Sequence, residues 1–184
     1  TLEQSSNNKE LSYLVMPIRG LMAILIMLCG LASALVFIND KKCGKFDWLS
    51  RKNQIIPAFA QCLAGISASA VFVLFGLFFA GIWEGVLKEV VSMLLFVIAS
   101  TGFCLIFALV FKSTSKFAAL IPAFIVLMLV LSPVFFDFNF LHGIKSMLPT
   151  HYYLFGIHNS SYLKGFVLYI VCVYFSARLI SRLN

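Results

Sequence analysis

The chain has 184 residues, of which 61% are hydrophobic and only 11% are charged. A soluble domain carries about 25% charged residues, so this chain has too few polar groups to cover a surface exposed to water. The net charge of +7 could suggest nucleic-acid binding, but the sequence has no glycine-rich phosphate loop, no basic stripe with interleaved aromatic residues and no zinc-ligand spacing. We therefore expect an integral membrane protein that binds no nucleic acid.

Five long apolar stretches follow one another, separated by short polar segments. We expect transmembrane helices at residues 18–38, 55–82, 90–111, 117–136 and 163–180, because about 20 apolar residues in a helix cross a bilayer core of about 30 Å. The last stretch is long enough if Lys164 and Arg178 extend to the two interfaces. The predicted fold is an all-α polytopic membrane protein that forms a single transmembrane domain over residues 1–184.

The first predicted span begins at Pro17, a residue that suits the first turn of a helix, and its only charge is Arg19 at the edge. None of the seven acidic residues is expected deep inside a span. This argues against a proton-coupled carrier, which would usually need an ionisable residue within the membrane. The sequence shows no nucleophilic triad and no paired carboxylates, so we expect no enzymatic activity in this chain.

The second and third predicted spans contain small and hydroxyl-bearing residues. Gly65 and Ser69, and likewise Gly76 and Ala80, stand one helical turn apart, a spacing that favours close helix packing in lipid. The alternative is that these residues line a substrate path. In the third span, the hydroxyls of Ser100 and Thr101 are expected to bond back to the helix backbone.

Basic residues fall on one side of the membrane if the spans alternate in direction. Nine of the 14 belong to this side: Lys41, Lys42, Lys45, Arg51, Lys52, Lys112, Lys116, Arg178 and Arg182. Short loops rich in Lys and Arg mark the cytoplasmic side. We therefore expect the N-terminus outside, the C-terminus in the cytoplasm, and contact between the basic loops and anionic lipid.

The loop after the first span is the most informative polar segment. Gly44 is expected to separate it from the preceding helix, and Phe46 and Leu49 share one face of a short amphipathic helix at spacing i, i+3. Such a helix either lies on the membrane surface or docks into a groove of a soluble partner. Both alternatives remain open at this point.

The outer segment 137–162 is too apolar for a free loop and too interrupted for a span. We expect a re-entrant segment of short half-helices within the outer leaflet. It holds His142, His151 and His158, with Asp137 nearby, but the spacing matches no closed metal motif, so we predict no metal site. An aromatic belt at the interface is expected to contain three tyrosines: Tyr152, Tyr153 and Tyr162.

Three segments of the chain resemble the membrane permease subunit of ATP-binding-cassette transporters of the type-2 permease (ABC-2) class, which is mostly bacterial. They are the basic loop 40–49, the Ser-Pro end of the fourth span at 131–136, and the outer segment that leads to 148–154 before one last helix. Permeases of this class have six spans. The resemblance implies that this chain corresponds to spans two to six, with a first span before Thr1.

The resemblance also implies a division of labour among chains. This chain would form the translocation path of an exporter in the bacterial cytoplasmic membrane, paired with a second permease subunit as a homo- or heterodimer. A separate ATPase subunit would bind ATP and Mg²⁺, and this chain would hold no cofactor. The implied coupling residues are Gly44, Lys45, Phe46, Asp47, Trp48 and Leu49. The implied outer gate contains Ser132, Pro133, Phe135, Phe136, Pro149, Tyr152 and Tyr153.

Two other functions compete with the permease. One is a membrane scaffold or sensor-associated subunit that transports nothing. The other is a small intramembrane enzyme that uses the outer histidines, of which His151 is the candidate to test.

Overall fold

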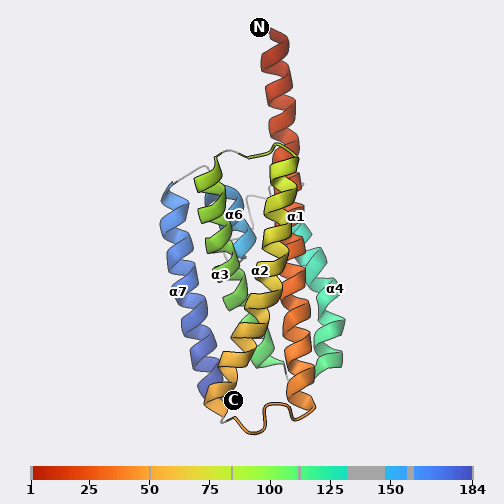
Figure 1. Cartoon of the computed structure of the whole chain (residues 1–184), viewed down its shortest axis with the longest axis vertical. Coiled ribbons are helices and arrows are strands. Elements are labelled where there is room, and N and C mark those ends of the chain that lie inside the picture. The colour runs from red at the N-terminus through yellow and green to blue at the C-terminus, as the bar shows by residue number, and fades with distance from the viewer. Residues whose placement is uncertain are drawn as a thin grey trace.

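The computed structural model describes residues 2–49, 51–83, 85–111, 113–131, 148–156 and 160–183. Side chains are described within 17–49, 53–83, 85–111, 113–130, 148–154 and 164–180. The predicted all-helical architecture is confirmed for these residues, which include no β-strand. Figure 1 shows long helices side by side, with the N-terminal part of the first helix extending beyond the others.

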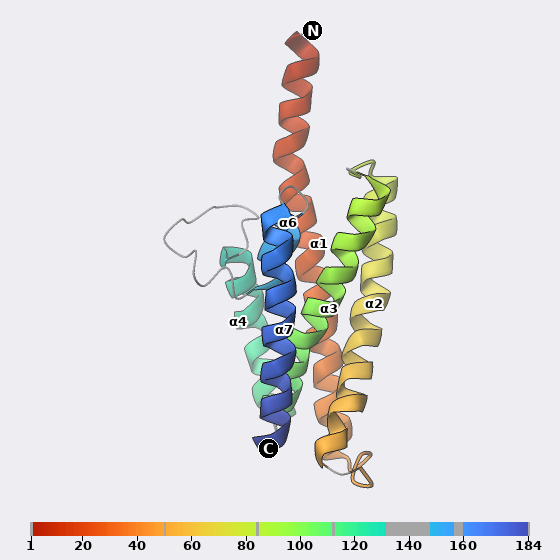
Figure 2. The same cartoon turned by 90° about the vertical axis from the view of Figure 1, so that its left-hand side faces the viewer.

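The elements, in chain order, are α1 (Leu2–Lys42), the 3₁₀-helix η1 (Arg51–Gln54), α2 (Ile55–Phe79), α3 (Val86–Val110), α4 (Thr114–Leu131), α6 (Pro149–Gly156) and α7 (Ser160–Leu183). Three segments are long and apolar enough to cross a membrane: Pro17–Lys42 of α1, α2 and α3. α4 and α7 run alongside them (Figures 1 and 2). The predicted span 117–136 continues past Leu131, outside the described residues.

Helix α3 occupies the centre of the bundle. It contacts α1, α2, α6 and α7. Helix α4 packs against α1 and also meets α3 through the rings of Phe107 and Phe124, whose centroids are 4.8 Å apart. Figure 2 shows α4 and α2 on opposite sides of α1 and α3. In the most apolar 18-residue stretch of α3, 61% of the residues are buried inside the bundle, compared with 33% in α2. Most of this stretch of α2 is therefore left for lipid or another protein to cover.

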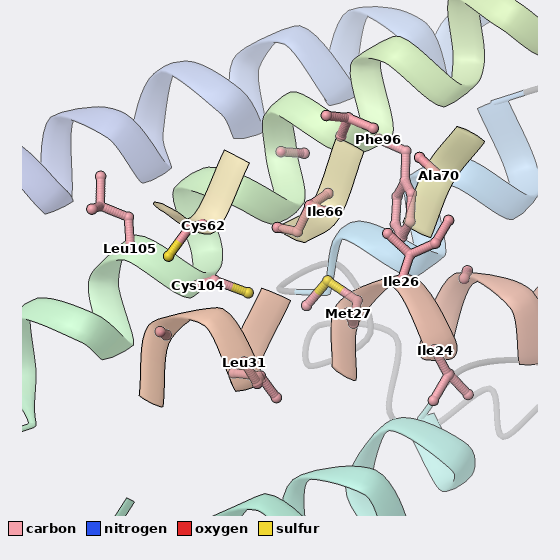
Figure 3. Packing of buried hydrophobic residues seen from close by; sticks show 14 of the residues in the cluster. Ile24, Ile26, Met27, Leu31, Cys62, Ile66, Ala70, Phe96, Cys104 and Leu105 are labelled. Carbon is pink, nitrogen blue, oxygen red and sulfur yellow. The ribbon is translucent and has the colours of Figure 1, made fainter. Parts of the chain in front are cut away.

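The core is filled by side chains from α1, α2 and α3 that meet at close range (Figure 3). Met27, Cys62, Ile66 and Cys104 are all fully buried. At Gly30 the helices approach so closely that an added Cβ would lie 2.7 Å from both Cys104 Sγ and Ile66 Cδ1. The core is thus packed to a density at which a single methyl group would not fit.

The outer surface of the bundle is apolar rather than polar. On α2, Phe72 is 79% exposed, Phe79 is 82% exposed, and Phe75 and Phe78 are also exposed. Contiguous apolar surface of this kind is rare on soluble monomers. Together with the three long apolar helices, it makes this chain a membrane protein whose surface is solvated by lipid.

Helix boundaries differ from the prediction at three places. α1 begins at Leu2, so Pro17 lies inside the helix and does not start it. α2 ends at Phe79, because Gly81 adopts a φ of +69° and the Gly81 and Ile82 amides donate to the carbonyls of Phe78 and Leu77 at 3.0 and 3.2 Å. These two bonds form a Schellman motif, which ends a helix. The third helix begins at Val86, before the expected residue 90.

The small residues of α2 divide into two groups. Gly65 meets α1 so closely that an added Cβ would lie 1.9 Å from Ser33 Oγ, which confirms helix packing at this position. Gly76 is exposed, with nothing within 4 Å of such a Cβ, so it packs against none of the described residues. The predicted back-bond is confirmed for Thr101, whose hydroxyl donates to the Val97 carbonyl at 2.7 Å. It is wrong for Ser100, whose buried hydroxyl has no hydrogen-bond partner among the described residues.

Candidate functional site

The segment between α1 and α2 forms consecutive turns at 43–48, where a short amphipathic helix was expected. Gly44 has a φ of +76°. Its amide donates to the Lys41 carbonyl at 3.1 Å, and the Lys45 amide donates to the Asp40 carbonyl at 3.2 Å. This Schellman motif ends α1 and turns the chain away from the helix axis. A left-handed glycine followed by tight turns replaces the predicted helix.

Aromatic contacts and polar bonds hold this turn segment, residues 43–49, in place. Phe46 stacks on Phe37 of α1, with ring centroids 5.4 Å apart. Lys45 Nζ donates to Asp40 at 2.6 Å, and the indole of Trp48 donates to the Lys45 carbonyl at 3.0 Å. Despite these bonds, Trp48 is 81% exposed. The segment therefore presents a large aromatic side chain from a fixed backbone.

The surroundings of the turn segment are basic. The elements at this end carry Lys41, Lys42, Lys45, Arg51, Lys52, Lys116, Arg178 and Arg182 (Figures 1 and 2). Lys112 lies outside the described residues. The hydrogen bond from Lys45 to Asp40, and the charge of that carboxylate, raise the pKa of the Lys45 amine above 10.5. Lys45 is therefore positively charged at any physiological pH.

The predicted outer gate is only partly described. Ser132, Pro133, Phe135 and Phe136 lie outside the described residues. The remaining three residues lie in α6, at the end of the bundle opposite the turn segment (Figure 1): Pro149, Tyr152 and Tyr153. The structure thus describes three of the seven expected residues, all on a helix of eight residues.

The tyrosines of α6 point into the bundle. Tyr153 is 1% exposed, and its ring lies 4.9 Å from that of Phe96 in α3. Tyr152 stacks on Phe166 of α7 at 5.6 Å. The prediction of an aromatic belt is therefore wrong for Tyr153, because packing against α3 removes it from the interface. The side chain of Tyr162 is outside the described residues.

A buried ion pair lies beside α6. The guanidinium of Arg19 in α1 donates to the carboxylate of Glu89 in α3 and, at 2.8 Å, to the carbonyl of Ile82 just beyond α2. The two charged side chains are 4% and 0% exposed. This pair links α1 and α3 to the chain just beyond α2. Glu89 lies in the first turn of α3 and not deep inside a span, but the structure buries its side chain there, which the sequence did not predict.

The buried polar group around this pair continues into α6. Thr150 is fully buried and His151 is 5% exposed. Burial, together with the negative charge of Glu89, raises the pKa of the Tyr153 phenol, so its hydroxyl keeps its proton and can donate a hydrogen bond. We call Arg19, Glu89 and Tyr153 the polar cluster.

His151 is the one histidine whose side chain the structure describes. The ring of His151 packs edge-on against Tyr152, with centroids 5.6 Å apart. No group of three potential metal ligands occurs among the residues that the structure describes. Asp137, His142 and His158 lie outside them.

Sequence reasoning missed the Arg19–Glu89 pair for two reasons. The third span was expected to begin one residue after Glu89, and helix ends are uncertain by a few residues when read from sequence. A pairing between residues 70 positions apart is set by the fold and not by the local pattern. One signal was available: two opposite charges at the same end of the predicted first and third spans.

No family model, no curated protein and no solved structure matches this chain. The resemblance to ABC-2 permeases therefore remains a prediction based on the three sequence segments.

Proposed function

We propose that this chain is a membrane-spanning permease subunit of an ATP-driven exporter, coupled through the turn segment to a separate ATPase subunit. It crosses the bacterial cytoplasmic membrane with five helices, with its N-terminus outside and its C-terminus in the cytoplasm. A second permease subunit, identical or related, completes the translocation path. ATP and Mg²⁺ bind to the ATPase subunit and not to this chain.

The geometry of the turn segment carries this proposal. A coupling element transmits the movement of the ATPase to the membrane helices. Its contact residue therefore has to project from a backbone whose conformation is constrained. Trp48 is 81% exposed, while Phe46 is stacked on α1 and Gly44 fixes the chain direction. Tryptophan side chains that fill a partner's pocket are among the strongest contributors to protein–protein affinity.

The arrangement of charge supports the same reading. Basic side chains around the turn segment support a cytoplasmic location for this end by the positive-inside rule, and the cytoplasm is where an ATPase has access to ATP. The apolar surface of α2 can face either lipid or the second permease subunit. A soluble partner that presents an acidic rim and an apolar pocket would complement this end of the bundle.

The first test is co-purification of the ATPase. The tagged chain is extracted from its native membrane with mild detergent, and bound proteins are identified by mass spectrometry. We expect an ATPase with a phosphate-binding loop, and ATP hydrolysis by the purified complex. Trp48→Ala should reduce recovery of this ATPase about 30-fold, as expected for the loss of a contact worth about 2 kcal/mol.

A matched control separates loss of ATPase docking at Trp48 from the general effect of removing an exposed aromatic side chain. Phe79 is as exposed as Trp48, at 82% against 81%, but lies at the opposite end of the bundle. Phe79→Ala should leave ATPase recovery unchanged, and Phe46→Ala should weaken it because Phe46 supports the turn. If both Trp48→Ala and Phe46→Ala retain full recovery and full ATP hydrolysis, the coupling function is wrong.

A further inference from the structure

The polar cluster joins three helices at the end of the bundle opposite the turn segment. One guanidinium, that of Arg19, contacts the carboxylate of Glu89 in α3 and the Ile82 carbonyl beyond α2. Helix α6 lies against the same helices, with Tyr153 packed on Phe96. Any separation of α1 from α3 at this end must first separate Arg19 from Glu89.

This ion pair is shielded from water, in contrast to the one at the other end. The side chains of Arg19 and Glu89 are 4% and 0% exposed, whereas that of Lys45, which pairs with Asp40, is 61% exposed. Burying two charges costs much of what their attraction returns, and apolar side chains of similar volume would often hold the helices as well. A role in stability alone therefore explains this pair poorly.

The polar cluster also contains unused hydrogen-bonding capacity. Glu89 Oε2 and the Tyr153 hydroxyl are buried and have no hydrogen-bond partner among the described residues. Buried polar atoms usually have a partner. Here one acceptor on α3 and one hydroxyl donor on α6 lie in the same cluster, so the Tyr153 hydroxyl is available as a second partner for the carboxylate.

We propose that the Arg19–Glu89 ion pair is a latch that holds this end of the bundle closed, and that opening transfers the Glu89 carboxylate to the hydroxyl of Tyr153. Water that enters the opened end then solvates the Arg19 guanidinium. Two alternative partners of the carboxylate give the two discrete arrangements that a conformational switch requires. The latch itself does not depend on the proposed function. Its purpose does, because we propose that opening this end releases cargo through the outer gate.

The latch can be tested by cysteine accessibility in the intact chain, reconstituted in lipid nanodiscs. Ala23 is fully buried and lies one helical turn after Arg19 in α1, so Ala23→Cys reports on opening at this end. Ala108 is 3% exposed near the other end of α3, so Ala108→Cys reports on general unfolding. A membrane-impermeant maleimide is added, and modification of each reporter is followed by mass spectrometry.

Glu89→Gln should accelerate modification of the Ala23→Cys reporter about tenfold or more, because the substitution removes the buried ion pair that joins α1 to α3. The Ala108→Cys reporter should stay within about twofold of its original rate, since only one end opens. Lys88→Gln, which removes an exposed charge next to Glu89, should change neither rate. The charge exchange Arg19→Glu with Glu89→Arg should restore slow modification to within about threefold.

Three results would overturn the latch. The first is that Glu89→Gln leaves modification of the Ala23→Cys reporter as slow as before. The second is that both reporters accelerate together, and the third is that the charge exchange fails to restore slow modification, because in either case the pair would act only in overall folding. The measurement requires neither an ATPase nor a substrate, so its outcome is separate from that of the coupling experiment.

Discussion

At the residue scale, glycines decide how closely the helices approach one another. Gly65 in α2 faces Ser33 and the Cys29 carbonyl of α1, and the Ser33 hydroxyl is itself bonded to that carbonyl at 2.9 Å. An added methyl group would overlap Ser33 Oγ. Close backbone approach at small residues is the main source of helix association in lipid, where the hydrophobic effect between helices is absent.

Gly65→Ala is therefore expected to lower the free energy of unfolding by about 1–3 kcal/mol, the usual cost of overpacking. Gly76→Ala is the matched control, because Gly76 belongs to the same helix and has open space around it. It should leave stability unchanged or raise it by about 0.4–1 kcal/mol. Unfolding by SDS in mixed micelles measures both variants. Equal effects of the two substitutions would show that α1 and α2 do not meet at Gly65.

Residue-scale prediction succeeded in part for local hydrogen bonds and failed for contacts between distant residues. The back-bond of Thr101 follows from the geometry of one helical turn, but the same reasoning was wrong for the neighbouring Ser100. The Arg19–Glu89 pair depends on the rotation of two helices about their axes, which brings both side chains inward. No local pattern carries that information.

At the element scale, the end of α1 determines the form of the turn segment. Gly44 needs a positive φ, and its position also places an added Cβ 2.9 Å from Asp47 Oδ2. A helix that continued past Gly44 would carry Phe46 and Trp48 along the α1 axis. The Schellman motif instead returns Phe46 to α1 and leaves Trp48 exposed.

Gly44→Val is expected to destabilise this conformation by about 1–2 kcal/mol, because β-branched residues strongly disfavour the left-handed region. Gly44→Asn should cost less, since asparagine tolerates that region. The stability of each variant is measured by SDS unfolding, and ATPase recovery by co-purification. If valine and asparagine have the same effect on both measurements, the left-handed turn is not what positions Trp48.

Element-scale prediction recovered the helices better than their connections. Long apolar runs predicted the positions of α1, α2 and α3 because each satisfies its own backbone in lipid. The turn segment was predicted as a helix from the i, i+3 spacing of Phe46 and Leu49, but consecutive turns are compatible with the same spacing. The left-handed conformation of Gly44 favours the turns over the helix.

At the scale of the whole molecule, alternating helix directions gather the basic residues at one end. The turn segment and the C-terminal end of α7 lie at this end, and α6 lies at the other (Figure 1). The positive-inside rule assigns the basic end to the cytoplasm. The polar cluster and the turn segment would then face opposite sides of the membrane.

This orientation predicts the reactivity of Cys43, which is exposed in the turn segment. A membrane-impermeant maleimide should leave Cys43 unmodified in intact cells and modify it in inside-out vesicles. Lys88→Cys, at an exposed position near the opposite end, should show the reverse pattern. Modification of Cys43 in intact cells would invert the assigned orientation and remove the basis for ATPase docking.

The sequence by itself determined that this chain belongs in a membrane, that its core elements are helices, and where basic charge gathers. Each of these properties is a sum over neighbouring residues, so composition and run length suffice to predict it. Only the tertiary structure decided that α3 is central, that Tyr153 faces inward, and that Arg19 and Glu89 meet. These features depend on how separate helices rotate and cross, and contacts between residues far apart in the chain fix that arrangement.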